Sequence, residues 1–286
     1  MELLNRRSFE ENVFKLLMFI SVIIVLGSLC IIIGLVVVNG ASSITLEMIT
    51  RTPSSGDYLG QSTGGILNAI LGSLILVLPA TGLAFLIGIC IALYLQREFT
   101  HPGFATFIRF SLDVLWGIPS ILYGVFCFMI MIALGVGASV LAGIFALTLL
   151  EIPIITRYMD ESISLVPFGL KEGAYSLGST RFETAIKVVR RQAFPGILAG
   201  VLLGLGRGIG DAASILFTAG FSDRIPGSVF DATATLPTMI YNLFSSPFPL
   251  VRQRAYAAAF ILLVIVLLIS IISRVLSKRY MKHVIR

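Results

Sequence analysis

The sequence has 286 residues, of which 57% are hydrophobic and only 13% are charged. Its mean hydropathy of +0.97 lies far above that of soluble globular domains, so the composition excludes a soluble protein and indicates an integral membrane protein. The formal net charge is +6. The basic residues are distributed, as described below, in the way that membrane topology requires, so we attribute this charge to topology and not to nucleic-acid binding.

A helix needs about 20 consecutive apolar residues to cross the roughly 30 Å hydrocarbon core of a bilayer. Stretches of this kind occupy residues 14–38, 66–95, 107–134, 138–157, 195–220 and 254–276. The sequence therefore predicts an all-α membrane protein with six transmembrane helices. We expect residues 1–13 to form a short N-terminal segment and residues 14–286 to form one transmembrane domain.

The basic residues predict the orientation of these helices. An even number of spans places both termini on one side of the membrane, and that side would hold 16 of the 21 Lys and Arg residues. The opposite side would hold Arg51, Arg224, Arg252 and Arg254. Because cytoplasmic loops carry the excess of basic residues, we expect both termini and the 158–194 loop in the cytoplasm, with outer loops at about 39–64 and 221–253.

Two of the early spans contain a proline. Pro79 lies in the second span, and Pro119 lies in the third span within the run Gly-Ile-Pro-Ser at residues 117–120. Proline removes a backbone hydrogen bond and clashes with the preceding turn of a helix. We therefore expect a kink or a break at both positions.

The fourth span contains a carboxylate, Glu151, two residues before Pro153. A charged side chain at the centre of a membrane helix costs about 2.5–3.5 kcal/mol on insertion scales. One interpretation is a structural ion pair with an arginine such as Arg157. The other is a functional role inside the membrane.

The segment after the fourth span predicts two short amphipathic helices. Pro167 suits the first turn of the first helix, and Gly178 suits its end because glycine tolerates a left-handed backbone. Residues 180–183, Thr-Arg-Phe-Glu, have the form of a capping box that starts the second helix. We expect Pro195 to end the second helix.

The fifth span is rich in glycine and has two charged residues. Its glycines include Gly200, Gly204, Gly206, Gly208 and Gly210. Small residues at a spacing of four let helices approach closely in lipid, so this helix is expected to be central in the bundle. Arg207 and Asp211 are four residues apart and are therefore expected to share a helix face and to form a salt bridge.

The second large outer segment, residues 221–253, contains four prolines around an apolar run, residues 236–244. We expect this run to form a short helix at the outer membrane interface.

Several kinds of chemistry are absent from the sequence. It has no Gly-Lys dipeptide, so the phosphate-binding loop of nucleotide-hydrolysing proteins is missing. Its two histidines, His101 and His283, and its dispersed cysteines favour neither a metal site nor a histidine-based acid/base site. We therefore expect no cofactor, no metal and no enzymatic activity in this chain alone.

Four segments between about residues 110 and 275 form a recognisable series. They are GIPSILYGVF, the run from IPIITRYMDE to KEGAYSLGSTRF, GRGIGDAASILFTAG and LPTMIYNLFSSPFP. The EGAYSLG run, residues 172–178, resembles the EAA loop of ABC importer permeases, and the four segments in order resemble the phosphate importer permeases of the PstA type. The resemblance implies the type I (MetI-like) importer fold, in the cytoplasmic membrane of a prokaryote.

The resemblance also implies residue roles and partners. The resemblance places coupling to a PstB-like ATPase dimer at Glu172, Gly173, Ala174 and Gly178. Because they are charged residues within membrane spans, Arg207, Asp211 and Glu151 are the residues that we expect in the translocation path for phosphate. The implied partners are the ATPase, a PstC-like second permease and an extracytoplasmic PstS-like phosphate-binding protein. PstA-like chains usually carry Glu where this chain has Asp211.

Two alternatives to a phosphate path stay open from the sequence. The chain could be the permease for another oxyanion, such as molybdate or sulfate. It could instead anchor an ATPase at the membrane and signal through it without passing a substrate. At Arg207 and Asp211, a purely structural salt bridge is the alternative to a role in the path.

Overall fold

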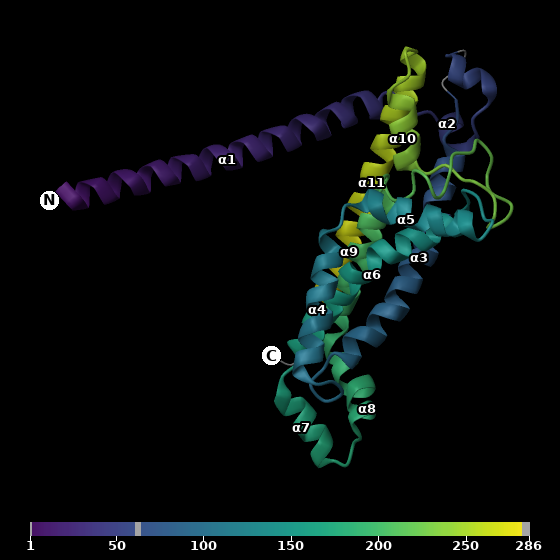
Figure 1. Ribbon diagram of the computed structural model, residues 1–286. Coiled ribbons are helices and arrows are strands. Elements are labelled where there is room, and N and C mark those ends of the chain that lie inside the picture. Colours follow the sequence, from purple (N-terminus) through teal and green to yellow (C-terminus); the bar gives the residue numbers. More distant parts are fainter. Residues whose placement is uncertain (1, 61–63, 282–286) are drawn as a thin grey trace.

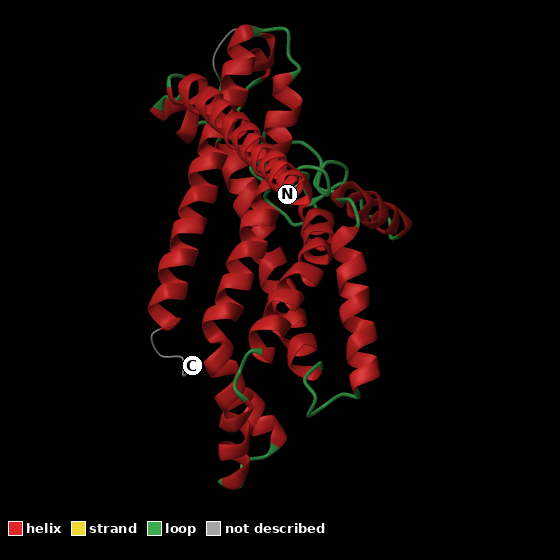
Figure 2. Cartoon of the chain, turned by 90° about the vertical axis from the view of Figure 1, so that its left-hand side faces the viewer, coloured by secondary structure: helices red, strands yellow, loops and turns green. Residues whose placement is uncertain are grey.

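The computed structural model describes residues 2–60 and 64–281, and all regular secondary structure in this part of the chain is helical (Figures 1 and 2). The predicted all-α fold class is therefore confirmed. In chain order the elements are α1 (Glu2–Ala41), α2 (Leu46–Thr50), the 3-10 helix η1 (Ser55–Leu59), α3 (Leu67–Tyr94), α4 (Pro102–Gly117), α5 (Ser120–Ala133), α6 (Val140–Ser164), α7 (Phe168–Ser176), α8 (Arg181–Glu183), the π-helix η2 (Thr184–Val189), α9 (Arg190–Gly210), α10 (Leu236–Phe244) and α11 (Pro249–Met281).

Within the described residues, five helices are long and apolar enough to cross a membrane, and α4 with α5 makes a sixth span if the bent pair is taken as one. The bend between α4 and α5 is 96°. Ile118 is extended there (φ −70°, ψ 131°), because the ring of Pro119 disfavours a helical backbone in the preceding residue. The third predicted span, residues 107–134, is therefore not one straight helix, although its break lies where the Gly-Ile-Pro-Ser run predicted it.

Two other prolines lie inside helices. Helix α3 is not broken at Pro79, so a kink is what stays a prediction there. The prediction that Pro195 ends the second helix of the 158–194 segment is wrong, because Pro195 lies inside α9. Membrane helices tolerate an internal proline because neighbouring helices and local adjustments compensate for the lost backbone hydrogen bond. The fifth predicted span is also shorter at its end, since α9 stops at Gly210 and not near residue 220.

Helix α6 lies in the middle of the bundle, and α9 packs against it through glycines. Two-thirds (67%) of the most apolar window of α6 is buried, against 39% for the helix Arg181–Gly210, so α6 is more central than the fifth span that we expected there. A Cβ atom added at Gly196, Gly200, Gly204 or Gly208 would come within 3 Å of a side chain of α6. These four glycines, spaced four residues apart, let the two helices approach closely, as the sequence predicted.

Helix α1 leaves the bundle at a steep angle, and only its C-terminal end lies beside α11 (Figures 1 and 2). No residue of its most apolar window is buried within this chain. Side chains such as Phe14, Phe19 and Ile24 are more than 60% exposed. An apolar helix of this kind needs lipid or another membrane protein to cover it.

The α10 segment and the first outer loop form the opposite end of the bundle from α7 and α8 (Figure 1). The predicted short helix at residues 236–244 is confirmed as α10, which starts at a capping box between Thr235 and Thr238. Met48, Leu236, Met239 and Val251 join α2, α10 and α11 in one buried cluster. This cluster fixes the loops at that end to the bundle.

Candidate functional site

The first part of the site is the helical hairpin formed by α7, α8 and η2, residues 168–189, which we call the elbow (Figure 1). Pro167 directly precedes α7, and Gly178 turns the chain between the two arms with a left-handed backbone (φ +83°). Thr180 and Glu183 form the predicted capping box at the start of α8. The local signals in the sequence therefore account for both arms and for the turn.

The elbow projects from the bundle and exposes its predicted coupling residues. Glu172, Gly173 and Gly178 are exposed, and Ala174 is half-buried. The elbow and the end of α6 also expose large apolar side chains: Leu165, Phe168, Leu177 and Phe182 are 62–90% exposed. Large exposed apolar side chains along such a segment are typical of a surface that another protein covers.

The elbow continues into the membrane without a loop. From Arg181 to Gly210 the chain is one helix of 30 residues, about 45 Å long. Its only irregular part is the π-helical stretch η2, and π-helical turns inside helices occur frequently at functional sites. The second arm of the elbow and α9 are therefore parts of one continuous helix.

Glu151 of α6 faces α9 near the C-terminal end of that helix. Glu151 is fully buried, and neither of its carboxylate oxygens has a hydrogen-bond partner within the described residues. The carboxylate lies against Gly208, where an added Cβ would come 1.9 Å from Glu151 Oε1. The predicted pair between Glu151 and Arg157 is wrong, since the Arg157 side chain binds Asp113 at 2.8 Å and Asp160 at 3.4 Å.

Arg207 lies one residue before Gly208, so it is level with Glu151 near the middle of α6. It is exposed, and no ion pair or hydrogen bond joins its side chain to another residue in the described part of the chain. Because each helical residue turns about 100°, Arg207 points away from the α6-facing glycines. An exposed arginine at this depth needs water or another protein subunit around it, because lipid does not solvate its charge.

Asp211 does not form the predicted salt bridge with Arg207. Helix α9 ends at Gly210, and Asp211 is extended (φ −79°, ψ 124°), so the two side chains no longer share a helix face. The Asp211 carboxylate instead accepts hydrogen bonds from the Ser214 amide at 2.8 Å and from the Ser214 hydroxyl. Asp211 thus shapes the turn that follows α9, and Arg207 is left without an intramolecular counter-ion among the described residues.

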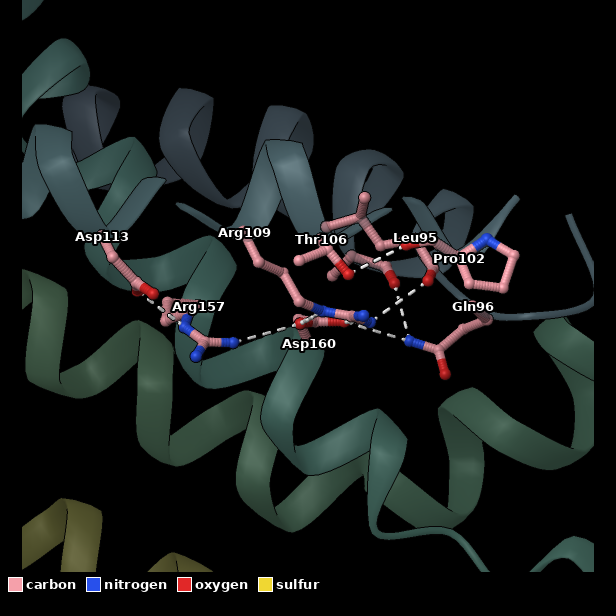
Figure 3. A network of polar contacts seen from close by, with 9 residues as sticks. Leu95, Gln96, Pro102, Thr106, Arg109, Asp113, Arg157 and Asp160 are labelled. Carbon is pink, nitrogen blue, oxygen red and sulfur yellow. Dashed lines mark hydrogen bonds and ion pairs between the residues drawn. The ribbon is translucent and has the colours of Figure 1, made fainter. Parts of the chain in front are cut away.

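A second polar network lies at the elbow end of the bundle (Figure 3). The sequence did not indicate it. Its centre is Asp160 of α6, which accepts hydrogen bonds from Gln96 and Arg109 and pairs with Arg157. Nearby, Glu98 pairs with Lys171 of the elbow at 2.8 Å. Only Arg157 and Asp160 have helical spacing, so the other partners could not be read from local sequence.

Residues 84–282 match the family model of the binding-protein-dependent transport system inner membrane component. The chain belongs to this family of importer permease components. The predicted class is thus confirmed for the region that contains the elbow, Glu151 and Arg207.

Individual relatives resemble the whole chain. The phosphate transport system permease protein PstA of Haemophilus influenzae is 35% identical over 259 residues, which cover 90% of each protein. PstA of Mycobacterium leprae is 34% identical over 91% of this chain and 86% of its own length. The resemblance to PstA-type permeases found in the sequence is therefore confirmed.

Solved structures share the fold at low sequence identity. A chain of the MetNI methionine ABC transporter in an inward-facing conformation aligns with a TM-score of 0.62 at 18% identity, over 79% of this chain and 99% of that chain. A chain of a bacterial ABC transporter for the polysaccharide alginate aligns with a TM-score of 0.63 at 15% identity, over 96% and 99%. These structures support the MetI-like importer fold for this chain.

Proposed function

We propose that this chain is a permease subunit of an ABC importer for inorganic phosphate and that its α9 lines the translocation path. The path assignment rests on Arg207. This arginine is exposed at the level of the middle of α6, and it has no intramolecular counter-ion among the described residues. A guanidinium in this position attracts an oxyanion and offers it charge-assisted hydrogen bonds. The named PstA relatives support phosphate as that oxyanion.

In this proposal the elbow receives the signal from ATP. The elbow lies in the cytoplasm, as the excess of basic residues predicts, and its exposed apolar side chains dock on a PstB-like ATPase dimer. Closure of the ATPase dimer displaces the elbow, and the continuous helix Arg181–Gly210 carries the displacement to Arg207. To reverse a 1:99 equilibrium between two conformations of the transporter, ATP must bind the favoured conformation more tightly than the other by about 5.5 kcal/mol.

The remaining partners are those that the resemblance to PstA-type permeases implies. A PstC-like second permease covers the exposed face of Arg207, so that the path runs between two permeases. An extracytoplasmic PstS-like protein delivers phosphate at the α10 end. Asp211 and Glu151 shape the path indirectly, through the turn after α9 and through the packing of α6 against Gly208.

The complete transporter, reconstituted in proteoliposomes with its binding protein, tests this proposal. We expect ATP-dependent uptake of labelled phosphate that excess unlabelled phosphate abolishes and that molybdate and sulfate leave unchanged. Equal competition by molybdate or sulfate would assign the path to another oxyanion. ATP hydrolysis that no substrate stimulates would instead favour a membrane anchor that transports nothing.

Replacing Gly178 with valine tests the elbow. The left-handed backbone at this position costs a residue with a side chain about 1–2 kcal/mol, so we expect the turn between α7 and α8 to change shape. Phosphate transported per ATP hydrolysed should fall while the protein still inserts in the membrane. Gly169→Val is the matched control, because Gly169 lies in the same hairpin with open space around it and without a left-handed backbone. An unchanged ratio in Gly178→Val would remove the elbow from the mechanism.

A further inference from the structure

The loop between α3 and α4, residues 95–101, contacts both arms of the elbow. The Glu98 carboxylate accepts a hydrogen bond from Lys171 Nζ of α7 at 2.8 Å, and its backbone carbonyl accepts one from Arg181 Nη1 of α8 at 3.0 Å. The side chains of Glu98 and Lys171 are only 15% and 10% exposed. Although burial opposes it, the bond from Lys171 holds the pKa of Glu98 below its usual value. A pair so shielded from water is costlier to break than a surface pair.

The same loop is fixed to the bundle on its other side (Figure 3). Asp160 of α6 is 1% exposed, and its carboxylate accepts two hydrogen bonds from Arg109 of α4, at 2.7 and 2.9 Å. Gln96 of the loop donates to Asp160 at 3.2 Å, and Arg109 also donates to the Leu95 carbonyl at 3.1 Å. Bidentate bonds between arginine and a carboxylate fix geometry as well as adding energy.

From α4 the contacts continue to the turn after Arg207. The Tyr123 hydroxyl of α5 donates to the Leu115 carbonyl of α4 at 2.8 Å, which braces the 96° bend between the two helices. Gly124 of α5 packs against the backbone of Ser214, where an added Cβ would come 2.5 Å from the carbonyl oxygen. Ser214 is the residue that Asp211 binds.

We propose that residues 95–101 clamp the elbow to the α4–α5 pair, with Glu98 and Asp160 as positioning residues, so that elbow movement reaches the Arg207 region by a second route. The first route is the covalent helix through α9. The second runs from the elbow through Glu98 and the Asp160 network to α4, α5 and the Ser214 turn. This inference rests on the proposed function, since it requires the elbow to be driven by an ATPase.

Charge exchange between Glu98 and Lys171 tests the clamp in the complete reconstituted transporter. We expect Glu98→Lys and Lys171→Glu each to lower phosphate transported per ATP hydrolysed by at least about fivefold, the lower end of typical allosteric couplings. The double exchange should restore the ratio to within about twofold of the unaltered protein, because it re-forms the pair with reversed polarity. A merely structural brace would change the yield of assembled transporter and leave this ratio unchanged.

Two comparisons keep the test decisive. Glu161→Lys is the matched control, because Glu161 is an exposed carboxylate at the same end of α6 and its side chain makes no hydrogen bond or ion pair with another described residue. If a reversed single variant fails to assemble, Glu98→Gln keeps the shape and removes the charge, and its ratio is measured instead. An unchanged ratio in the assembled Glu98 variants, or a double exchange no better than the single changes, overturns the clamp.

The Gly178→Val variant, measured in parallel, separates the two proposals. If it uncouples transport while the Glu98 variants do not, the clamp is wrong and the elbow mechanism stands. If neither kind of variant changes the ratio, the proposed elbow mechanism itself fails.

Discussion

Replacing Gly208 with alanine is expected to destabilise the protein by about 1–3 kcal/mol, the usual cost of overpacking a filled interior. The new methyl group would come 1.9 Å from Glu151 Oε1 and 2.9 Å from a methyl carbon of Val77, so the carboxylate must move out of its place between α6 and α9. The free energy of unfolding of the purified permease in mixed micelles measures this loss. We expect phosphate uptake to fall as well, because α9 can no longer lie close to α6.

Two controls identify the cause of the Gly208 effect. Gly206→Ala lies in the same helix, with its nearest neighbouring atom at 3.9 Å, and should change stability little. In the Glu151→Ala background the Gly208→Ala change should cost much less, because the clashing carboxylate is gone. An equal cost in both backgrounds would contradict the packing of Glu151 against Gly208.

Replacing Arg207 with alanine should reduce phosphate uptake by at least about tenfold while the transporter still assembles. Hydrogen bonds to charged groups contribute about 1.5–3 kcal/mol, and about 1.4 kcal/mol corresponds to a tenfold change. Assembly should survive because, in the proposal, the Arg207 side chain faces the path between the two permeases, and it has no ion pair or hydrogen bond with another described residue of this chain. Uptake in proteoliposomes and the yield of the purified complex measure the two effects.

Arg207→Lys and Arg252→Ala complete this comparison. Lysine keeps the positive charge but loses the bidentate geometry of arginine, so we expect intermediate uptake. Arg252 is an exposed arginine near the start of α11, and its removal should leave uptake unchanged. Normal uptake in Arg207→Ala would remove Arg207 from the path, whereas loss of assembly would favour a structural role.

Local signals in the sequence predicted much of the fold. Gly178 and the Thr180 capping box define the elbow, and residues 236–244 form the helix that their composition indicated. The glycines spaced four apart in the fifth span do meet a neighbouring helix. These features depend on the backbone preferences of a few neighbouring residues, or on the regular spacing of apolar and small residues along a helix. Both can be recognised in a single amino-acid sequence.

The sequence predicted the charged site less well because its geometry depends on tertiary structure. The predicted Arg207–Asp211 pair required the helix to continue past Gly210, and it does not. The partner of Arg109 is Asp160, 51 residues away, and no local spacing indicates such a pair. Glu151 lies against a glycine and not beside a cation. This placement results from the packing of α6 on α9, which the sequence does not show.

Thiol labelling tests whether the exposed face of Arg207 lines an aqueous phosphate path. Leu203 and Gly210 lie one turn before and one turn after Arg207 and are exposed like it. Each is replaced by cysteine in a chain whose native Cys30, Cys90 and Cys127 are alanine, and the complete transporter is treated with a charged, membrane-impermeant thiol reagent. We expect labelling at one or both positions, at a rate that ATP changes and that phosphate slows. Absence of labelling at both positions, with and without ATP, in a transporter that still takes up phosphate would contradict the proposed path.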